Sequence, residues 1–362
     1  MDKKPERLVP EVRFKGFTDD WEQRKFDNVV KRINDKDDNP ELPHIEFENI
    51  ISGNGTLNKN IKNLNSKKIG TKFQKEDILF GKLRPYLKNW YFAKENGIAV
   101  GDFWVLRAKK ISVFVYYLIQ TEKFYSIANL SSGSKMPRSD WNLVSNSRFN
   151  FPENTIESIK IGNLILQFDK LITLQQRKLE ILIKLKQSFL TKSMVNNLDK
   201  NPELYFNSAS IKWLKQKLSN LTIKEFKGNT KLNDTKPGKT EYLDAERLNG
   251  NAPLFIDKPI NTLKSDILIL WDGSKAGSVY YGFEGSLGST LKAIRLNPKL
   301  VNSFFVYQQL KSKQDVIFNK YRTPNIPHVI KNFTKVYSIY FPSMAVQNKI
   351  ARFLGNLDTL IE

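Results

Sequence analysis

Sulfur and imidazole chemistry are almost absent from this sequence. The chain contains no cysteine, and its only histidines are His44 and His328. Without cysteine there are no disulfides, no thiolate nucleophiles and no zinc sites with sulfur ligands. Two histidines leave very little for a histidine-rich metal cluster or for a catalytic triad that needs imidazole. We therefore expect no metal site and no catalytic residues of these kinds.

Long apolar runs are missing as well. No uncharged apolar stretch approaches the roughly 20 residues that a membrane helix requires. The chain opens with Met-Asp-Lys-Lys-Pro, and no apolar segment follows that could serve as a secretion signal. We expect a soluble, cytoplasmic protein that does not enter a membrane.

The common enzyme signatures are absent too. The sequence has no GxxxxGK[ST] phosphate loop, no GxGxxG after a strand, no amino-methyl-transfer signature and no GxSxG elbow. Glu225-Phe226-Lys227 fits the Glu-x-Lys half of a metal-dependent nuclease centre, but patterns this short arise by chance in a chain rich in Lys and Glu. A stand-alone metal-dependent nuclease, or a fused restriction enzyme fragment, is the alternative function that this pattern leaves open.

Positive charge is what the chain has in excess. It carries 58 Lys and Arg against 37 Asp and Glu, a formal net charge of +21, and the excess is spread along the chain. With 40% hydrophobic and 12% aromatic residues the composition is that of a globular protein. The charge therefore belongs to folded domains and predicts a polyanionic partner.

The two halves of the chain resemble each other at a nearly constant offset. Trp21 corresponds to Trp213, an offset of 192 residues, and Asp77 corresponds to Asp266, an offset of 189. Further matches in the same order are Phe151-Pro152 with Phe341-Pro342, and residues 160–172 with 349–361. An internal repeat of this kind predicts two similar domains of one fold.

Each half contains strand-like runs and closes with a helix. Short runs rich in Ile, Val, Phe and Tyr are bounded by Gly, Asn and Pro, which is typical of strands; they are residues 77–80, 98–106, 266–271 and 336–341. Residues 157–195 contain no Pro and repeat apolar residues at spacings of three and four, which predicts a helix of about 58 Å. The expected fold class is α/β with two similar domains.

We divide the chain accordingly into four segments. They are a first domain at 1–156, a central spacer helix at 157–195, a second domain at 196–343 and the start of a distal helix at 344–362. The long helix could be a core helix of one domain, but its length favours a coiled-coil spacer. The apolar residues expected at a helix or subunit interface are Ile161, Phe168, Ile172, Leu179, Leu182 and Phe189.

Both domains place basic loops after matching strands. Cations neutralise phosphates, and amide, guanidinium or hydroxyl groups on loops can reach base edges. The loops at 81–90 and 131–138 in the first half correspond to those at 271–277 and 319–325 in the second, with different residues at equivalent positions. The candidate DNA-binding residues are Lys82, Arg84, Tyr86, Lys88, Ser134, Lys135, Arg138, Asp272, Ser274, Lys275, Lys320, Arg322 and Asn325. We expect double-stranded DNA as the partner, with a different sequence read by each domain.

Four segments together resemble a known family. They are the Phe-x-Gly-Phe-Thr-Asp-Asp-Trp-Glu-Gln-Arg-Lys opening at 14–25, Arg84-Pro85-Tyr86-Leu87, Trp271-Asp272-Gly273-Ser274, and Gln175-Gln176-Arg177-Lys178-Leu179 in the long helix. In their order and duplicated layout they resemble the specificity (S) subunit of type I restriction-modification enzymes. The resemblance spans essentially the whole chain.

The resemblance implies a division of labour between subunits. The two domains would be target recognition domains in a pseudo-two-fold arrangement, held apart by long helices that pair as an antiparallel coiled coil, and each would read one half of a split DNA site. The chain itself would not be catalytic and would bind no cofactor. S-adenosylmethionine, ATP and Mg would belong to modification (methyltransferase) subunits, which clasp the helices, and to a restriction subunit.

The distal helix departs from the pattern of the family. Glu362 aligns with Thr173, so the counterpart of about 174–195 is missing from the sequence. We expect a truncated distal helix whose missing partner surface leaves part of the central apolar stripe exposed, and hence possible self-association. A truncated regulatory or inactive S subunit is accordingly a further alternative.

Overall fold

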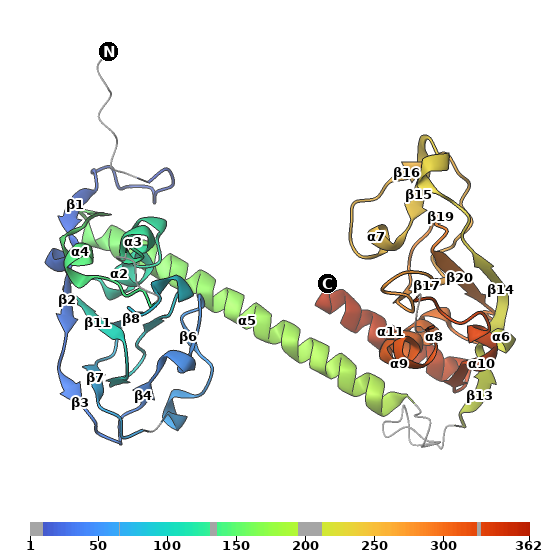
Figure 1. The fold of residues 1–362 in the computed structure, drawn as a ribbon, viewed down its shortest axis with the longest axis horizontal. Helices are drawn as coiled ribbons and strands as arrows, with labels where there is room; N and C mark the ends of the chain where they lie inside the picture. The colour runs from blue at the N-terminus through green and yellow to red at the C-terminus, as the bar shows by residue number, and fades with distance from the viewer. Residues whose placement is uncertain (1–9, 65, 131–135, 195–211, 324–326) are drawn as a thin grey trace, which may run out of the picture. The chain divides into compact units, whose positions relative to one another are not determined.

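The computed structural model describes residues 10–64, 66–130, 136–194, 212–323 and 327–362 (Figure 1). The chain forms two compact units, which we call unit 1 (Met1–Leu174) and unit 2 (Gln175–Glu362). Each unit has its own sheets and its own hydrophobic core, and each is described below by itself.

Unit 1 is built around two four-stranded sheets. The central sheet, antiparallel throughout and in the order β2-β11-β8-β9, comprises β2 (Val30–Ile33), β11 (Phe103–Ala108), β8 (Ile78–Gly81) and β9 (Trp90–Phe92). The second sheet comprises β3 (Lys36–Asp37), β7 (Gly70–Phe73), β10 (Gly97–Ala99) and β4 (His44–Ile45). Two-stranded ribbons are formed by β1 (Glu22–Lys25) with β12 (Arg148–Phe151), and by β5 (Ile50–Ile51) with β6 (Thr56–Leu57).

Short helices complete unit 1 before the long helix begins. The α-helices are α1 (Phe26–Val29), α2 (Ser112–Leu118), α3 (Glu122–Ala128) and α4 (Trp141–Asn146). Single 3-10 turns are η1 (Phe47–Asn49), η2 (Ile61–Asn63) and η3 (Pro85–Leu87).

The central sheet of unit 1 is buried on both faces. Along β8, Ile78 and Phe80 join the cluster formed with α2, α3 and α4, whereas Leu79 between them joins the cluster shared with the second sheet. Side chains alternate between the two faces of a strand, so a run that is apolar at every position is what a strand buried on both sides requires.

Unit 2 repeats this plan with a smaller second sheet. Its central sheet, in the order β14-β20-β17-β18, comprises β14 (Thr222–Lys227), β20 (Leu291–Leu296), β17 (Ile267–Leu270) and β18 (Val279–Tyr280). The second sheet comprises β16 (Phe255–Ile256), β15 (Pro237–Leu243) and β19 (Ser286–Leu287). The ribbon consists of β13 (Leu214–Lys217) and β21 (Ser338–Phe341).

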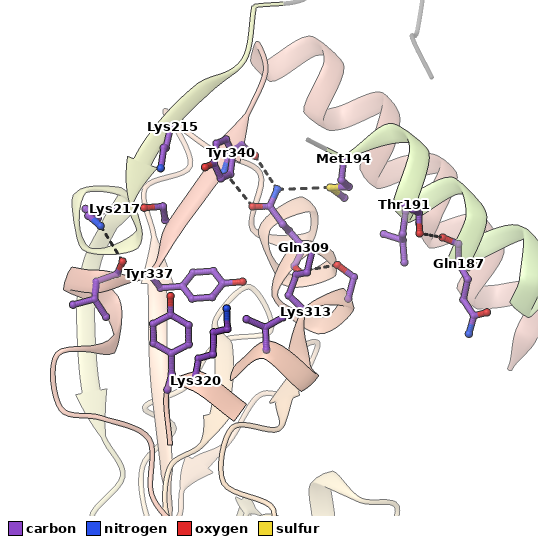
Figure 2. A pocket seen from close by; sticks show the side chains of 16 residues that line it. Gln187, Thr191, Met194, Lys215, Lys217, Gln309, Lys313, Lys320, Tyr337 and Tyr340 are labelled. Carbon is purple, nitrogen blue, oxygen red and sulfur yellow. Dashed lines mark hydrogen bonds between the residues drawn. The ribbon is translucent and has the colours of Figure 1, made fainter. Parts of the chain in front are cut away.

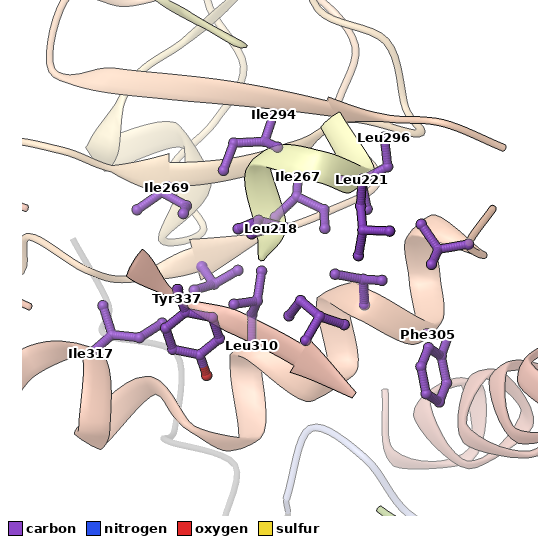
Figure 3. Close-up of a cluster of buried hydrophobic side chains, with 14 of the residues drawn as sticks. Leu218, Leu221, Ile267, Ile269, Ile294, Leu296, Phe305, Leu310, Ile317 and Tyr337 are labelled. Atoms are coloured by element: carbon purple, nitrogen blue, oxygen red, sulfur yellow. The ribbon is translucent and has the colours of Figure 1, made fainter. Parts of the chain in front are cut away.

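Several helices of unit 2 contribute to the core cluster on one face of its central sheet: α6 (Leu218–Leu221), α8 (Ser303–Ser312), α9 (Gln314–Lys320), α10 (Phe333–Val336) and α11 (Met344–Ile361). The short helix α7 (Ala245–Leu248) packs in the cluster on the other face, and η4 (Leu232–Asp234) is a single 3-10 turn. Figure 3 shows Ile267 and Ile269 of β17 facing Leu218 of α6 and Leu310 of α8. Leu268, on the opposite face of β17, belongs to the cluster with the second sheet.

The internal repeat predicted from the sequence is confirmed by these topologies. The central sheets have the same strand order, and each unit opens on a strand that pairs with the strand preceding its closing helix. The fold class is mixed α/β, as expected.

An ion pair with a buried carboxylate recurs at the same place in both units. Asp77, 2% exposed, accepts bonds of 2.8 and 2.7 Å from Arg107 on the neighbouring strand. Asp266, 0% exposed, accepts bonds of the same two lengths from Arg295. In each case the carboxylate also accepts a backbone amide three residues before it. A bidentate pair with every oxygen bonded meets the condition under which a buried ion pair is tolerated.

The long helix α5 runs over Thr155–Ser193, within two residues of the predicted bounds. Its first turns pack on unit 1, where Ile161 and Ile165 contact the core cluster. At Gly162 a Cβ atom would lie 2.6 Å from Cγ1 of Val113, so the absent side chain permits the close approach of α5 to α2.

Within unit 2 the last turns of α5 pack against α11. The rings of Phe189 and Phe353 lie 4.3 Å apart, and Lys186 forms an ion pair with Asp358. As the residue number rises along α5 it falls along α11, so the two helices run antiparallel at this contact. The antiparallel pairing that the resemblance implied is therefore present at the end of α5.

Two predicted strands have different bounds in the structure. The run 98–106 divides into β10 and β11, because the chain turns at Gly101, where φ is +97°. In the run 336–341 the first residue, Val336, closes α10 before β21 begins. Gly101 and Asp102 interrupt the first run, but the residues on both sides are apolar, so the pattern predicted one continuous strand.

Candidate nucleic-acid interface

The two basic loops predicted in unit 1 lie side by side at one edge of the central sheet. Leu83, in the loop that follows β8, forms an isolated β-bridge with Arg138 of the other loop. The Arg84 amide donates to Pro137 O at 2.7 Å, and the Ser139 amide donates to Lys82 O at 2.9 Å. These backbone bonds fix segment 136–139 against the loop after β8.

One carboxylate joins the cations of these two loops. Asp102, directly before β11, lies 3.5 Å from Lys82 Nζ and 3.0 Å from Arg138 Nη2. Partial burial opposes ionisation of Asp102, but the bonds and charges of Arg138 and Lys82 outweigh it and lower the pKa of the carboxyl group. The two cations are therefore held next to each other while Arg138 stays exposed.

The turn between the loop and β9 has an unusual backbone. Arg84 and Lys88, on either side of η3, have φ of +47° and +58°, which is uncommon for residues other than glycine. The Tyr125 hydroxyl donates to Pro85 O at 2.6 Å, and Lys88 Nζ lies 5.3 Å from the centre of the Tyr125 ring. Such conformations persist where the surroundings impose them and are concentrated at functional sites.

The side chains on this turn differ in exposure. Tyr86 and Lys88 are exposed, whereas Arg84 is half-buried. The Nε atom of Arg84 is buried and has no hydrogen-bond partner in the structure. A buried donor without a partner is costly, so this Nε–H is an unfavourable feature of the turn.

Unit 2 brings its predicted loops together at the corresponding edge. Asp272 forms an isolated bridge with His328, and Gly273 donates to Pro327 O at 3.0 Å. Arg322 donates to Ser274 O at 3.0 Å, which ties the late loop to the loop after β17. The juxtaposition is the same as in unit 1, although the residues differ.

The predicted residues of this edge include one member of an ion pair and several exposed side chains. Asp272 Oδ2 lies 2.5 Å from Lys227 Nζ on β14, so this carboxylate already has a cationic partner. Ser274, Lys275 and Lys320 are exposed. The predicted residues Ser134, Lys135 and Asn325 lie outside the described residues.

Sequence reasoning missed one acidic residue of these sites and two lysines that lie on strands. Asp102 and Lys227 were not singled out as members, and neither was Lys292, whose Nζ lies 4.1 Å from the centre of the Trp271 ring. Lys227 and Lys292 face each other in the β14–β20 register, a pairing that requires the strand alignment. The sequence of β14 carries Lys224 and Lys227 three residues apart, which gave no signal for this pairing.

The nuclease alternative has no support in the geometry. Glu225 forms an ion pair with Lys292 and accepts a hydrogen bond of 2.9 Å from the Thr334 hydroxyl. Within the part of the chain that the structure describes, no group of three or more His, Cys, Asp or Glu side chains could hold a metal ion. Glu225 is thus paired with Lys292 of β20 and Thr334 of α10.

The predicted interface residues of α5 fall into two groups. Phe168, Ile172 and Leu179 are exposed, and Leu182 is half-buried. Ile161 packs against the core of unit 1. Phe189, predicted as an interface residue, is only 7% exposed and lies in the core of unit 2 against Phe353, so its ring is not available to another subunit.

Comparison with known proteins shows what the chain is similar to. Residues 212–362 match the model of the type I restriction modification DNA specificity domain. Over 124 residues the chain is 34% identical to the type I restriction enzyme MjaVIII specificity subunit of Methanocaldococcus jannaschii, an alignment that covers 33% of this chain. The second half of the chain is therefore similar to a type I restriction-modification specificity domain. The alignment spans 29% of that relative's length.

The fold of the whole chain is that of solved specificity subunits. The S subunit of a type I restriction-modification system from M. genitalium matches with a TM-score of 0.67 at 17% identity, covering 98% of this chain and 92% of that one. A chain from a study of complex assembly and conformational transition of the type I R-M system matches with a TM-score of 0.50 at 16% identity, covering 97% and 92%. Among the described residues, no helix has the length and apolar character needed to span a membrane.

Proposed function

We propose that this chain is the DNA-recognition subunit of a type I restriction-modification complex, with one half of a split site read by each unit. The observation that carries the proposal is the duplication of the loop site. In both units two basic loops are bonded together at the same edge of equivalent sheets. One fold that presents two loop pairs with different side chains suits two different half-sites.

The chemistry of the loops suits a groove of double-stranded DNA. Lys275 and Arg138 are exposed cations suited to phosphates. Arg84 is half-buried in a turn with positive φ, and its guanidinium is a candidate for a bidentate contact with guanine. Asp102 would keep Lys82 and Arg138 in place before DNA arrives.

Assembly would depend on the exposed face of α5. Phe168, Leu171 and Ile172 are each more than half exposed, and apolar patches of this kind mark protein interfaces. We propose that modification subunits bind this face and that a restriction subunit joins them, with S-adenosylmethionine, ATP and Mg bound by those partners. The chain itself would recognise DNA without catalysing a reaction, and as a reader of cellular DNA it would act in the cytoplasm. A second copy of the chain could also cover the stripe.

Single substitutions test the assignment of the loops. Arg84→Ala should weaken binding to one half-site, and Lys275→Ala to the other, with losses of roughly tenfold to a hundredfold for a base-reading contact. The measurement is the affinity of the assembled complex for duplexes in which one half-site at a time is randomised.

A matched control separates specific from general effects. Lys239→Ala removes an exposed lysine of β15, away from both loops, and should change affinity for all duplexes only slightly. If Arg84→Ala and Lys275→Ala affected both half-sites equally, the assignment of one unit to one half-site would be wrong.

A further inference from the structure

A basic cavity in unit 2 lies outside the loops described above. It has a volume of about 730 Å³ and is bounded by the last turns of α5, the β13–β21 ribbon, and helices α8 and α9 (Figure 2). Ligand pockets in proteins commonly have volumes of about 300–1,000 Å³. The cavity is therefore large enough for a small ligand or for part of a nucleic-acid backbone.

Four lysines line this cavity. Lys215 and Lys217 come from β13, where residues two apart share a face, and Lys313 and Lys320 stand at the two ends of α9 (Figure 2). None of the lining residues in the described chain is Asp or Glu.

The walls hold two of these cations in defined positions. Lys217 donates to Val336 O at 2.9 Å, and Lys215 Nζ lies 5.3 Å from the centre of the Tyr340 ring. Gln309 is fixed by bonds to both the amide and the carbonyl of Tyr340. Ammonium groups gathered in a concave site repel one another and raise the local concentration of anions.

We propose that this cavity binds phosphate groups. Phosphate is a compact anion with several acceptor oxygens, and lysine is a common partner for it as a point charge. Hydroxyl groups of tyrosines in the wall, such as Tyr337 and Tyr340, can donate further hydrogen bonds. The phosphate could come from a free polyphosphate or nucleotide, or from the DNA backbone; the second source rests on the proposed function, and the first does not.

The test uses the full chain and inorganic tripolyphosphate as the probe. The variant carries Lys215→Gln and Lys313→Gln, while Lys217 is kept because it bonds to the backbone, and Lys320 is kept because it belongs to a candidate DNA loop. The control carries Lys239→Gln and Lys299→Gln, which remove the same charge from exposed positions outside the cavity. Unfolding temperatures without ligand check that all three proteins fold.

The two sources give different results. If the ligand is free, tripolyphosphate raises the Tm of wild type and control by several degrees and leaves the cavity variant unchanged. If the source is DNA, tripolyphosphate has no such effect, but the slope of log affinity against log salt falls by about 0.9 for each lost contact in the cavity variant. The cavity variant should then keep its preference between target sequences. Loop variants such as Arg84→Ala should lose that preference. If the cavity variant equals the control in both measurements, the proposal is overturned.

Discussion

At the scale of single residues, the clearest feature is a carboxylate–guanidinium pair that both units retain. Asp266 is completely buried and Arg295 mostly so, and Asp77 with Arg107 repeats the geometry in unit 1. Sequence comparison of the halves aligned the two aspartates, but it could not identify their arginine partners, which lie on another strand. The pairing depends on the register between β17 and β20.

Removing one partner of this pair should destabilise unit 2. Arg295→Met leaves the buried Asp266 carboxylate uncompensated, and we expect a loss of about 3 kcal/mol in the free energy of unfolding, measured by urea denaturation. Arg138→Met removes an exposed cation beside Asp102 and should cost less than about 1 kcal/mol. Equal losses in the two variants would contradict the structural role assigned to Asp266.

Asp102 should titrate below its ordinary range. Although partial burial opposes ionisation, Arg138 and Lys82 lower the pKa from 3.8. A lowered folded pKa contributes stability that is fully present above the unfolded value and is lost as the pH falls through the folded value. NMR titration of the carboxyl carbon should place the midpoint below 3.8, and Arg138→Ala should raise it. A midpoint that Arg138→Ala leaves unchanged would argue against the bridge.

At the scale of elements, α5 serves three purposes along its length. Its first turns pack on unit 1, its last turns pack on α11, and the apolar stripe between them is exposed. Periodicity in the sequence predicted the helix and the stripe within two residues. It could not separate exposed from buried positions, because Phe168 and Phe189 occupy the same stripe and differ only in whether α11 covers them.

Two phenylalanines of α5 should behave in opposite ways. Phe189→Ala removes a ring buried against Phe353 and should cost about 3–5 kcal/mol of unfolding free energy. Phe168 is 54% exposed, so Phe168→Ala should lower the free energy of unfolding by less than about 1 kcal/mol. The same substitution should weaken association with modification subunits. Urea unfolding and light scattering of the mixed subunits measure the two effects. Stability losses of equal size would show that the stripe is covered within the chain.

At the scale of the whole molecule, the duplicated fold could be predicted from the sequence because a few anchor residues keep their spacing. Trp21 and Trp213, and Asp77 and Asp266, mark equivalent positions in both units. The loop sites were predicted only in outline. Their basic segments were found from charge, but Asp102 and Lys227, which fix or neutralise the loops, depend on contacts between strands.

The central claim is that each unit reads its own half of a split DNA site. The most direct measurement is to assemble the chain with candidate modification subunits and sequence the duplexes that the complex selects from a random pool. It is then repeated with residues 214–343 replaced by the matching segment of a type I specificity subunit. We expect a site of two separated halves, of which one changes and the other stays the same. A contiguous site, or a change in both halves, would contradict the account.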